Sequence, residues 1–293
     1  MATTVGFVGL GKMGAPMARR LLDAGYDIVG VDPVVSARND LIAAGGRVVS
    51  SAAEISADVV ILMLPDSDVV ERVLFEGGLV DVLARGAIVV DMSSSAPLRT
   101  RQVADTLRSR GLRMVDAPVS GGVRGAQSGT LTIMVGGDAA DVAEVTSIID
   151  RLGATRHVGG IGAGHALKAL NNLLSATHLW ATSEALLVGE RFGLDPAVML
   201  DAINTSSGRS GSTEKKWPDF VLSGRFDSGF TAALMAKDVR VATALAHELG
   251  VPAVLSDLVE AEWTEAAERL GRSADHTEIA RLMRRTPADF SVD

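Results

Sequence analysis

The sequence predicts an α/β domain followed by an all-helical domain, with one long helix joining the two. Residues 1 to about 160 alternate between short apolar segments typical of strands and segments with helical periodicity. From Gly162 onward the periodicity is helical nearly throughout, beginning with one continuous pattern over residues 163–192. No low-complexity linker separates the two parts, so we place the domains at residues 1–161 and 162–293.

The first apolar run, residues 5–8, leads directly into a glycine-rich turn and then a helical segment over residues 15–22. The turn consists of Gly9, Leu10, Gly11, Lys12, Met13 and Gly14. In a G-x-G-x-x-G turn the first glycine permits a tight bend, the second admits a pyrophosphate, and the third lets the helix pack closely. The helix N-terminus then offers N–H groups and a positive dipole end to phosphates. This predicts a Rossmann-type dinucleotide site, with a ligand-free glycine turn as the alternative.

The second apolar run, residues 28–31, ends at Asp32. A carboxylate at this place accepts hydrogen bonds from the ribose hydroxyls of the adenosine and repels a 2′-phosphate. We therefore expect NAD as the cofactor in preference to NADP. Arg38 follows this strand and is the residue that could instead pair with a 2′-phosphate.

Further strands are expected at residues 47–49, 58–63, 86–91, 112–115 and 131–135. We expect Ser93, Ser94 and Ser95 to cap a helix that continues to residue 110, and a second helix over residues 139–152. Repeated strand–helix alternation predicts a parallel sheet with its binding crevice at the carboxyl ends of the strands. In the second domain, helices are expected to open at Asp195 and at residues 212–214, and to cover residues 232–249 and the stretch to about 270.

Composition excludes several classes of function. The chain has 293 residues, a net charge of −8 and no cysteine. Because the chain is acidic, we do not expect it to bind nucleic acid. Because it lacks cysteine, disulfides and thiolate chemistry are ruled out. The apolar stretch over residues 166–188 contains several polar and charged residues, so no membrane span is expected. The first strand starts by residue 4 or 5, with no basic segment and no cleavage site before it, so no secretory signal is expected. We therefore expect a cytoplasmic protein. The five histidines lack metal-ligand spacing, so no metal site is expected.

Two motifs near the domain junction carry chemistry. After the strand at residues 112–115, the run from Asp116 to Gly122 includes Ser120, Gly121 and Gly122. A hydroxyl and accessible N–H groups at a strand end can bind a carboxylate, although a plain turn explains them equally well.

The second motif begins at Gly162 and contains Lys168 and Asn172, which share one helix face at i and i+4. Burial among apolar neighbours favours the neutral amine of Lys168, the form that acts as a general base. The alternative is a lysine that extends to solvent beside a structural amide. His165 lies three residues before Lys168, where it either lines the binding crevice or is a surface residue at the helix start.

Taken together, these motifs resemble those of a known family, the NAD(P)-dependent β-hydroxyacid dehydrogenases. This family includes 3-hydroxyisobutyrate dehydrogenase and tartronate semialdehyde reductase. The resemblance runs from one end of the chain to the other. The matching segments are residues 6–14, residues 63–65, Ser93 with Ser94, residues 116–122, Lys168 with Asn172, and Lys237 with Asp238.

The resemblance implies a role for each matched residue. Lys168 would exchange the hydroxyl proton of the substrate, and Asn172 would be its partner in the substrate site. Ser120, Gly121 and Gly122 would bind the substrate carboxylate. Leu64, Pro65, Val69, Ser94 and Lys237 would contact the cofactor. The resemblance also implies a homodimer or homotetramer formed through the helical domain, which is 6-phosphogluconate dehydrogenase-like.

One segment departs from the family pattern. Where 3-hydroxyisobutyrate enzymes have an aromatic and asparagine-rich stretch, residues 205–213 are rich in hydroxyl groups and contain Arg209. This predicts a substrate more polar than 3-hydroxyisobutyrate, either a polyhydroxylated carboxylic acid or a sulfonic acid, with Arg209 among its ligands. The alternatives are an imine reductase of the same fold, which Lys168 disfavours, and a cofactor-binding protein without turnover.

Overall fold

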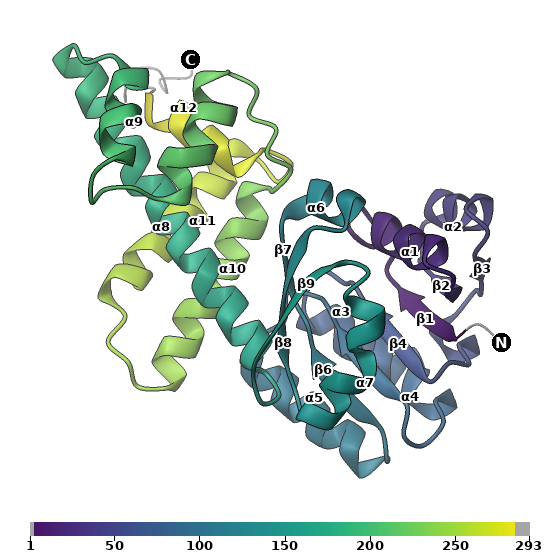
Figure 1. Cartoon of the computed structure of the whole chain (residues 1–293). Helices are drawn as coiled ribbons and strands as arrows, with labels where there is room; N and C mark the ends of the chain where they lie inside the picture. The colour runs from purple at the N-terminus through teal and green to yellow at the C-terminus, as the bar shows by residue number, and fades with distance from the viewer. Residues whose placement is uncertain (1–2, 285–293) are drawn as a thin grey trace, which may run out of the picture. The chain divides into compact units, whose positions relative to one another are not determined.

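The computed structural model describes residues 3–284, so the ends of the two predicted domains, residues 1–2 and 285–293, lie outside the described part. The chain divides into two compact units that meet between Lys168 and Ala169, inside the long helix α8 (Ala163–Phe192; Figure 1). We call them the sheet unit, which ends at Lys168, and the helical unit, which begins at Ala169. The predicted boundary after residue 161 falls just before α8 and stays a prediction.

Nine strands of the described chain form one sheet in the sheet unit, in the order β3-β2-β1-β4-β5-β6-β8-β7, with β9 paired to β8. The first six strands of this order run parallel, as predicted. Their bounds, with the remaining three, are β1 (Thr4–Val8), β2 (Asp27–Val31), β3 (Arg47–Val48), β4 (Val59–Leu62), β5 (Ile88–Asp91), β6 (Arg113–Asp116), β7 (Val119–Ser120), β8 (Leu131–Gly136) and β9 (Gly153–Gly159).

The far edge of the sheet departs from the predicted parallel arrangement. Strand β8 is antiparallel to both β6 and β7, and only β9 is parallel to β8. The helical segment over residues 122–128 connects β7 to β8 and returns the chain beside β7 in the opposite direction. Strand β7 lies inside the segment that carries Ser120, so this motif is partly strand rather than loop.

Helices surround the sheet (Figure 1), and the central strands are buried on both faces. Along β4, Val59 and Ile61 belong to one apolar core, while Val60 and Leu62 belong to the other. Burial on both faces explains the unbroken apolar runs in the sequence. The helices are α1 (Gly14–Asp23), α2 (Val35–Ala43), α3 (Ser67–Glu71), α4 (Leu79–Val82), α5 (Pro97–Ser109), α6 (Gly122–Ser128) and α7 (Ala139–Ile149), with the short turns η1 (Ala52–Glu54) and η2 (Arg72–Glu76).

The helical unit contains the rest of α8 and the helices that follow it. Its core includes two fully buried tryptophans, Trp217 and Trp263, and Trp180 packs edge-on against Trp263. Asp195 caps α9 as predicted, by accepting hydrogen bonds from two backbone N–H groups. The elements are α9 (Pro196–Asn204), the π-helix η3 (Ser212–Leu222), α10 (Ala232–Glu248), α11 (Val254–Leu270), η4 (His276–Glu278) and α12 (Ile279–Arg284). Across the described residues, no helix is both long and apolar enough to span a membrane.

Candidate active site

The glycine turn between β1 and α1 has the geometry that a dinucleotide requires. Gly9 has a φ of +96°, and a Cβ on Gly14 would lie 1.8 Å from the carbonyl oxygen of Gly9. A Cβ on Gly11 would meet no atom within 4 Å, so the space above the middle of the turn is open. The turn therefore needs Gly9 and Gly14 for its own packing, and Gly11 leaves room for a pyrophosphate next to the backbone. The residues present fit NAD(P).

Asp32 and Arg38 lie together at the end of β2. The Asp32 carboxylate, 9% exposed, accepts hydrogen bonds from the backbone N–H groups of Leu10 (2.7 Å) and Val34 (2.8 Å). It thus connects the glycine turn to the strand end. Arg38 donates to the carbonyl oxygens of Asp32 (2.7 Å) and Pro33 (3.3 Å). A negative side chain and a positive one therefore both lie where the adenosine ribose is expected.

The serines after β5 do not cap α5, contrary to the prediction. The N-cap of α5 is Ala96, which has no side-chain cap, and its N–H donates to Ser67 Oγ (2.8 Å). Ser93 Oγ instead accepts from the N–H of Leu64 (2.9 Å), and Ser95 Oγ donates to Asp91 (3.0 Å). Pro97 occupies the first position of α5, a common place for proline in a helix. Ser93 and Ser95 instead connect the segment after β5 to Leu64 and to Asp91 at the end of β5.

A buried cluster then links these loops to the start of α8. His165 is only 1% exposed, so its interpretation as a surface residue is wrong. Its ring lies between Thr100 Oγ1 (2.8 Å) and the carbonyl oxygen of Ser93 (3.2 Å). Asp116, at the end of β6, accepts from the N–H groups of Gly162 (2.7 Å) and His165 (2.8 Å) and so caps α8.

Asp116 and Asp91 are both fully buried, although no individual role was predicted for either of them. The signal was present, because an acidic residue directly after an apolar strand is seldom left unpaired when buried. A Cβ on Gly164 would lie 2.3 Å from the carbonyl oxygen of Met134, so glycine allows α8 to approach the sheet closely. Together these contacts fix the first turn of α8, one turn before Lys168.

In the predicted carboxylate-binding segment, Gly121 and Gly122 have φ values of +125° and +61° and are exposed, while Ser120 is half-buried. Positive φ values favour glycine at both positions, and the exposed backbone of this segment is of the kind that can bind an anion.

Lys168 is half-buried, and Leu167 and Leu170 beside it are 40% and 43% exposed, so the expected apolar burial of this lysine is not complete. One turn later, the amide of Asn172 donates to Asp238 Oδ2 (2.5 Å). Asp238 Oδ1 in turn pairs with Lys237 Nζ (3.0 Å). Asp238 on α10 therefore holds both Asn172 and Lys237, and the structure brings these three residues together within the helical unit.

Arg209 lies in an exposed segment between α9 and η3. Its side chain is 64% exposed and pairs with Glu214 at 3.7 Å. Its role in substrate binding stays a prediction. Of the remaining predicted cofactor residues, Pro65 is exposed, and Val69 in α3 and Ser94 are half-buried.

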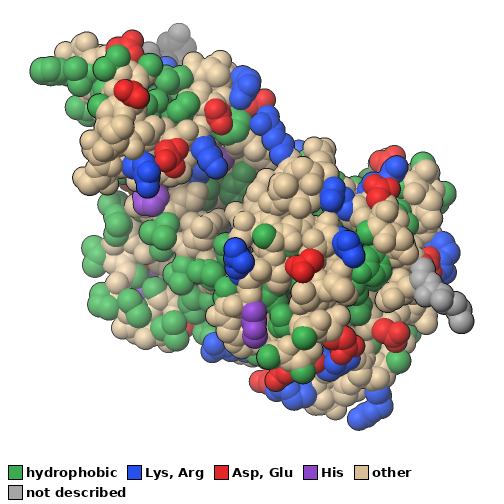
Figure 2. Space-filling view, viewed as in Figure 1, with side chains coloured by type: hydrophobic (Ala, Val, Ile, Leu, Met, Phe, Trp, Pro, Cys, Tyr) green, Lys and Arg blue, Asp and Glu red, His purple; other side chains and the backbone are tan. Residues whose placement is uncertain are grey.

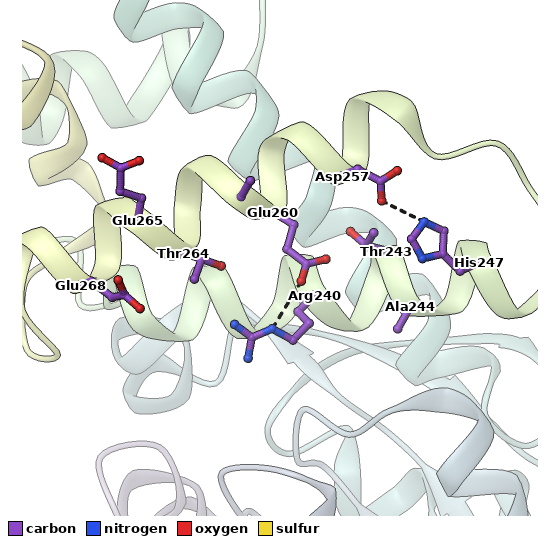
Figure 3. A pocket seen from close by; sticks show the side chains of 10 residues that line it. Arg240, Thr243, Ala244, His247, Asp257, Glu260, Thr264, Glu265 and Glu268 are labelled. Carbon is purple, nitrogen blue, oxygen red and sulfur yellow. Dashed lines mark ion pairs between the residues drawn. The ribbon is translucent and has the colours of Figure 1, made fainter.

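The helical unit also contains a groove of about 640 Å³ between α10 and α11 (Figure 3). Ion pairs cross it, between His247 and Asp257 (2.8 Å) and between Arg240 and Glu260 (3.4 Å). None of the predicted site residues lines this groove. Four carboxylates and a single arginine line it, so it lacks the cationic lining that an acid substrate requires.

Comparison with known proteins identifies the family. Residues 4–162 match the NAD binding domain of 6-phosphogluconate dehydrogenase, and residues 162–283 match the NAD-binding domain of NADP-dependent 3-hydroxyisobutyrate dehydrogenase. The chain belongs to the NAD(P)-dependent β-hydroxyacid dehydrogenase family. It is an enzyme that binds NAD(P) and acts on the CH–OH group of hydroxy acids.

Three relatives illustrate the similarity. The chain is 38% identical to 2-(hydroxymethyl)glutarate dehydrogenase of Eubacterium barkeri, over 85% of this chain and 84% of that one. It is 42% identical to the NAD-dependent L-serine dehydrogenase of Pseudomonas aeruginosa, over 81% and 83%. The structure of 3-hydroxyisobutyrate dehydrogenase from Mycobacterium tuberculosis with L-serine superposes with a TM-score of 0.90 at 32% identity, covering 97% of this chain and all of that one.

Proposed function

We propose that this enzyme oxidises a small β-hydroxy acid to its semialdehyde, or catalyses the reverse reduction, with NAD as cofactor. The observation that carries the proposal is the placement of Lys168 and Asn172 on one face of α8. Asp116 caps the first turn of this helix, and Asp238 accepts a hydrogen bond from the amide of Asn172. Compounds acted on by relatives, namely 3-hydroxyisobutyrate, L-serine and 2-(hydroxymethyl)glutarate, all carry a hydroxymethyl group next to a carboxylate-bearing carbon.

In the proposed mechanism, bound NAD would supply the acceptor for the hydride of the carbinol carbon. The neutral amine of Lys168 removes the hydroxyl proton as the C–H electron pair leaves, so a C=O bond forms. Asn172 orients the reacting hydroxyl group through its amide. The N–H groups of Gly121 and Gly122, with the Ser120 hydroxyl, bind the carboxylate of the substrate. In the reductive direction Lys168 returns the proton.

We also propose that the enzyme is a homo-oligomer formed through its helices. Leu167, Leu170 and Leu174 on α8 are 40–57% exposed, and their i, i+3, i+7 spacing places them on one face. Further large exposed apolar residues surround the connection between α10 and α11, where Figure 2 shows a concentration of hydrophobic side chains. Apolar stripes of this kind usually mark a protein interface. Light scattering during size exclusion tests it, and a monomer at micromolar concentration would contradict it.

The test of the reaction is a panel of small β-hydroxy acids assayed for reduction of NAD and NADP by the full-length protein. We expect measurable turnover with at least one acid that carries a hydroxymethyl group next to its carboxylate-bearing carbon. Turnover of α-hydroxy acids alone would overturn the proposed substrate class.

A further inference from the structure

A lysine outside the predicted site faces α8 within the helical unit. Lys216, on the π-helix η3, donates a hydrogen bond from Nζ to Ser175 Oγ at 2.7 Å. The backbone oxygen of Ser175 lies 3.5 Å from the same nitrogen. Burial lowers the pKa of Lys216 to about 8, although the Asp275 carboxylate opposes this shift. An amine held in this way is costly to keep charged, and its contacts with Ser175 do not compensate the charge.

The position of Ser175 relates this amine to the proposed substrate residues. Ser175 follows Asn172 by three residues on α8, so the two side chains lie on one helix face about 4.5 Å apart along the axis. Asn172 is held on that face by Asp238 from α10. Lys216 therefore presents its amine one helical turn beyond the residue that is proposed to orient the reacting hydroxyl group.

An ammonium group has three N–H donors. Ser175 Oγ accepts one of them at 2.7 Å, and the Ser175 carbonyl oxygen accepts a second at the longer distance of 3.5 Å. A carboxylate, phosphate or sulfonate would accept the remaining one and would add its negative charge to the partial compensation that Asp275 gives. Charge-assisted hydrogen bonds of this type are about twice as strong as neutral ones.

We propose that Lys216 and Ser175 form a second anion-binding position of the substrate site, selecting β-hydroxy acids whose side chain ends in a second anionic group. This inference rests on the proposed function, since Asn172 must orient the substrate for Lys216 to reach its side chain. It narrows the expected polar substrate to a dianion.

Two β-hydroxy acids with the same reacting centre test the proposal. In 3-hydroxyisobutyrate the side chain is a methyl group, and in 2-(hydroxymethyl)glutarate it is a carboxyethyl group. We expect the wild-type enzyme to have the higher kcat/KM for the dicarboxylate. Lys216→Met should lower this kcat/KM by about tenfold to a hundredfold, the worth of one hydrogen bond to a charged group. The loss should appear mainly as a higher KM for the dicarboxylate. The kcat/KM for the monocarboxylate should change little.

Lys215→Met is the matched control, because Lys215 is the exposed neighbour on the same helix. It removes the same charge from the same element and should leave both substrates unaffected. Thermal unfolding separates a structural effect from a binding effect. Because the buried charge is a cost, Lys216→Met should unfold at the same temperature as the wild type or above it.

The pH dependence gives a second readout. The titratable groups that interact with Lys216 across the fold are Asp275 and His276, and the pKa of each lies below its ordinary value. Neither therefore titrates near pH 8. The ratio of kcat/KM for the dicarboxylate to kcat/KM for the monocarboxylate cancels every pH effect that the two substrates share. This ratio should fall as the pH rises through about 8 in the wild type, as Lys216 loses its charge, and should be flat in Lys216→Met.

Calorimetric titration with 2-methylglutarate and isobutyrate, the same two acids without the hydroxyl group, measures binding apart from turnover. If Lys216→Met weakens the binding of both acids equally, or of neither, the second anion position is overturned while the proposed reaction stands. If the wild type oxidises neither β-hydroxy acid but Lys216 still selects 2-methylglutarate, the proposed reaction fails and the anion position stands.

Discussion

The amide of Asn172 donates to Asp238 Oδ2 at 2.5 Å, and Asp238 Oδ1 pairs with Lys237 at 3.0 Å. One buried carboxylate, 3% exposed, thus fixes two side chains that are proposed to face substrate and cofactor. Its own position is set by α10, which packs against α11. Asp238 is therefore a positioning residue: it acts on the reaction through Asn172 and Lys237.

We expect Asp238→Ala to lower kcat by about tenfold to a hundredfold, because displacement of an orienting group by about 1 Å costs this much. KM for the hydroxy acid should rise with it. Asp238→Asn should recover part of kcat, since its amide oxygen can still accept from Asn172. Steady-state kinetics with both variants measures this, and an unchanged kcat in Asp238→Ala would show that Asn172 needs no support.

The glycine turn offers a pair of matched substitutions. Gly11→Ala adds a methyl group into open space, so the protein should fold with normal stability. Its affinity for NAD should fall at least about tenfold, because that methyl group occupies the place of the pyrophosphate. Gly14→Ala places a Cβ 1.8 Å from the carbonyl oxygen of Gly9 and should destabilise the sheet unit itself. Thermal unfolding and NAD titration separate the two, and tight NAD binding by Gly11→Ala would place the pyrophosphate elsewhere.

Cofactor preference depends on Asp32 and Arg38. We expect a clear preference for NAD in kcat/KM, because the Asp32 carboxylate repels a 2′-phosphate across a short distance with little water between. Asp32→Asn keeps an oxygen that can accept from Leu10 and should reduce the preference without unfolding the turn. The check is kcat/KM with both cofactors. Equal or better use of NADP by the wild type would transfer the decisive role to Arg38.

Acid should destabilise the helical unit through Asp275 and His276. Burial lowers the pKa of His276 below 6.5 despite its hydrogen bond with Asp275. Burial alone would raise the pKa of Asp275, but hydrogen bonds from His276, Thr277 and Ser228 bring it well below 3.8. Both folded-state pKa values are depressed, so the stability from His276 is present above about pH 6.5 and that from Asp275 above about pH 4, and both are lost as the pH falls.

Thermal unfolding followed by circular dichroism measures this dependence. The Tm of the wild type should fall below pH 6.5, and Asp275→Asn should unfold at lower temperature at pH 7. The difference in Tm between the two proteins should narrow as the pH drops below 3.8. A difference that stays constant down to pH 3 would mean that Asp275 contributes nothing through its charge.

Secondary-structure elements with a long and regular apolar pattern were predicted correctly. The run of residues 163–192 is one helix with those bounds, because its apolar periodicity continues without a breaker. Strand β9 was missed because it is an edge strand whose residues are mostly exposed, so it lacks the apolar pattern that identified the central strands. The serines after β5 were misinterpreted because local sequence resembles a cap, whereas their partners, Leu64 and Asp91, are set by the neighbouring strand and the turn.

The buried polar residues were the least predictable part of the site. His165 contacts Thr100 and Ser93, which lie more than sixty residues away in sequence. Lys216 appears in a polar stretch that resembles a solvated helix start, and only the fold brings it to Ser175. Periodicity reports which face of an element is apolar, but it does not report which distant element supplies a hydrogen-bond partner for a polar group on that face.

Lys168 is the residue on which the proposed reaction depends. A hydride leaves a carbinol carbon readily only if the hydroxyl proton is removed at the same time, and a positioned base contributes about a hundred- to ten-thousand-fold. Lys168→Ala should therefore lower kcat by at least about a hundredfold. NAD affinity should be unchanged, since the glycine turn and Asp32 lie on other elements.

Lys168→Arg should recover little, because a guanidinium stays protonated and cannot act as a base. Asn172→Ala should cost less than Lys168→Ala, through misorientation of the hydroxyl group. Kinetics and NAD titration on the folded variants test this order, and near-normal turnover by Lys168→Ala would remove the proton-transfer role from α8 altogether.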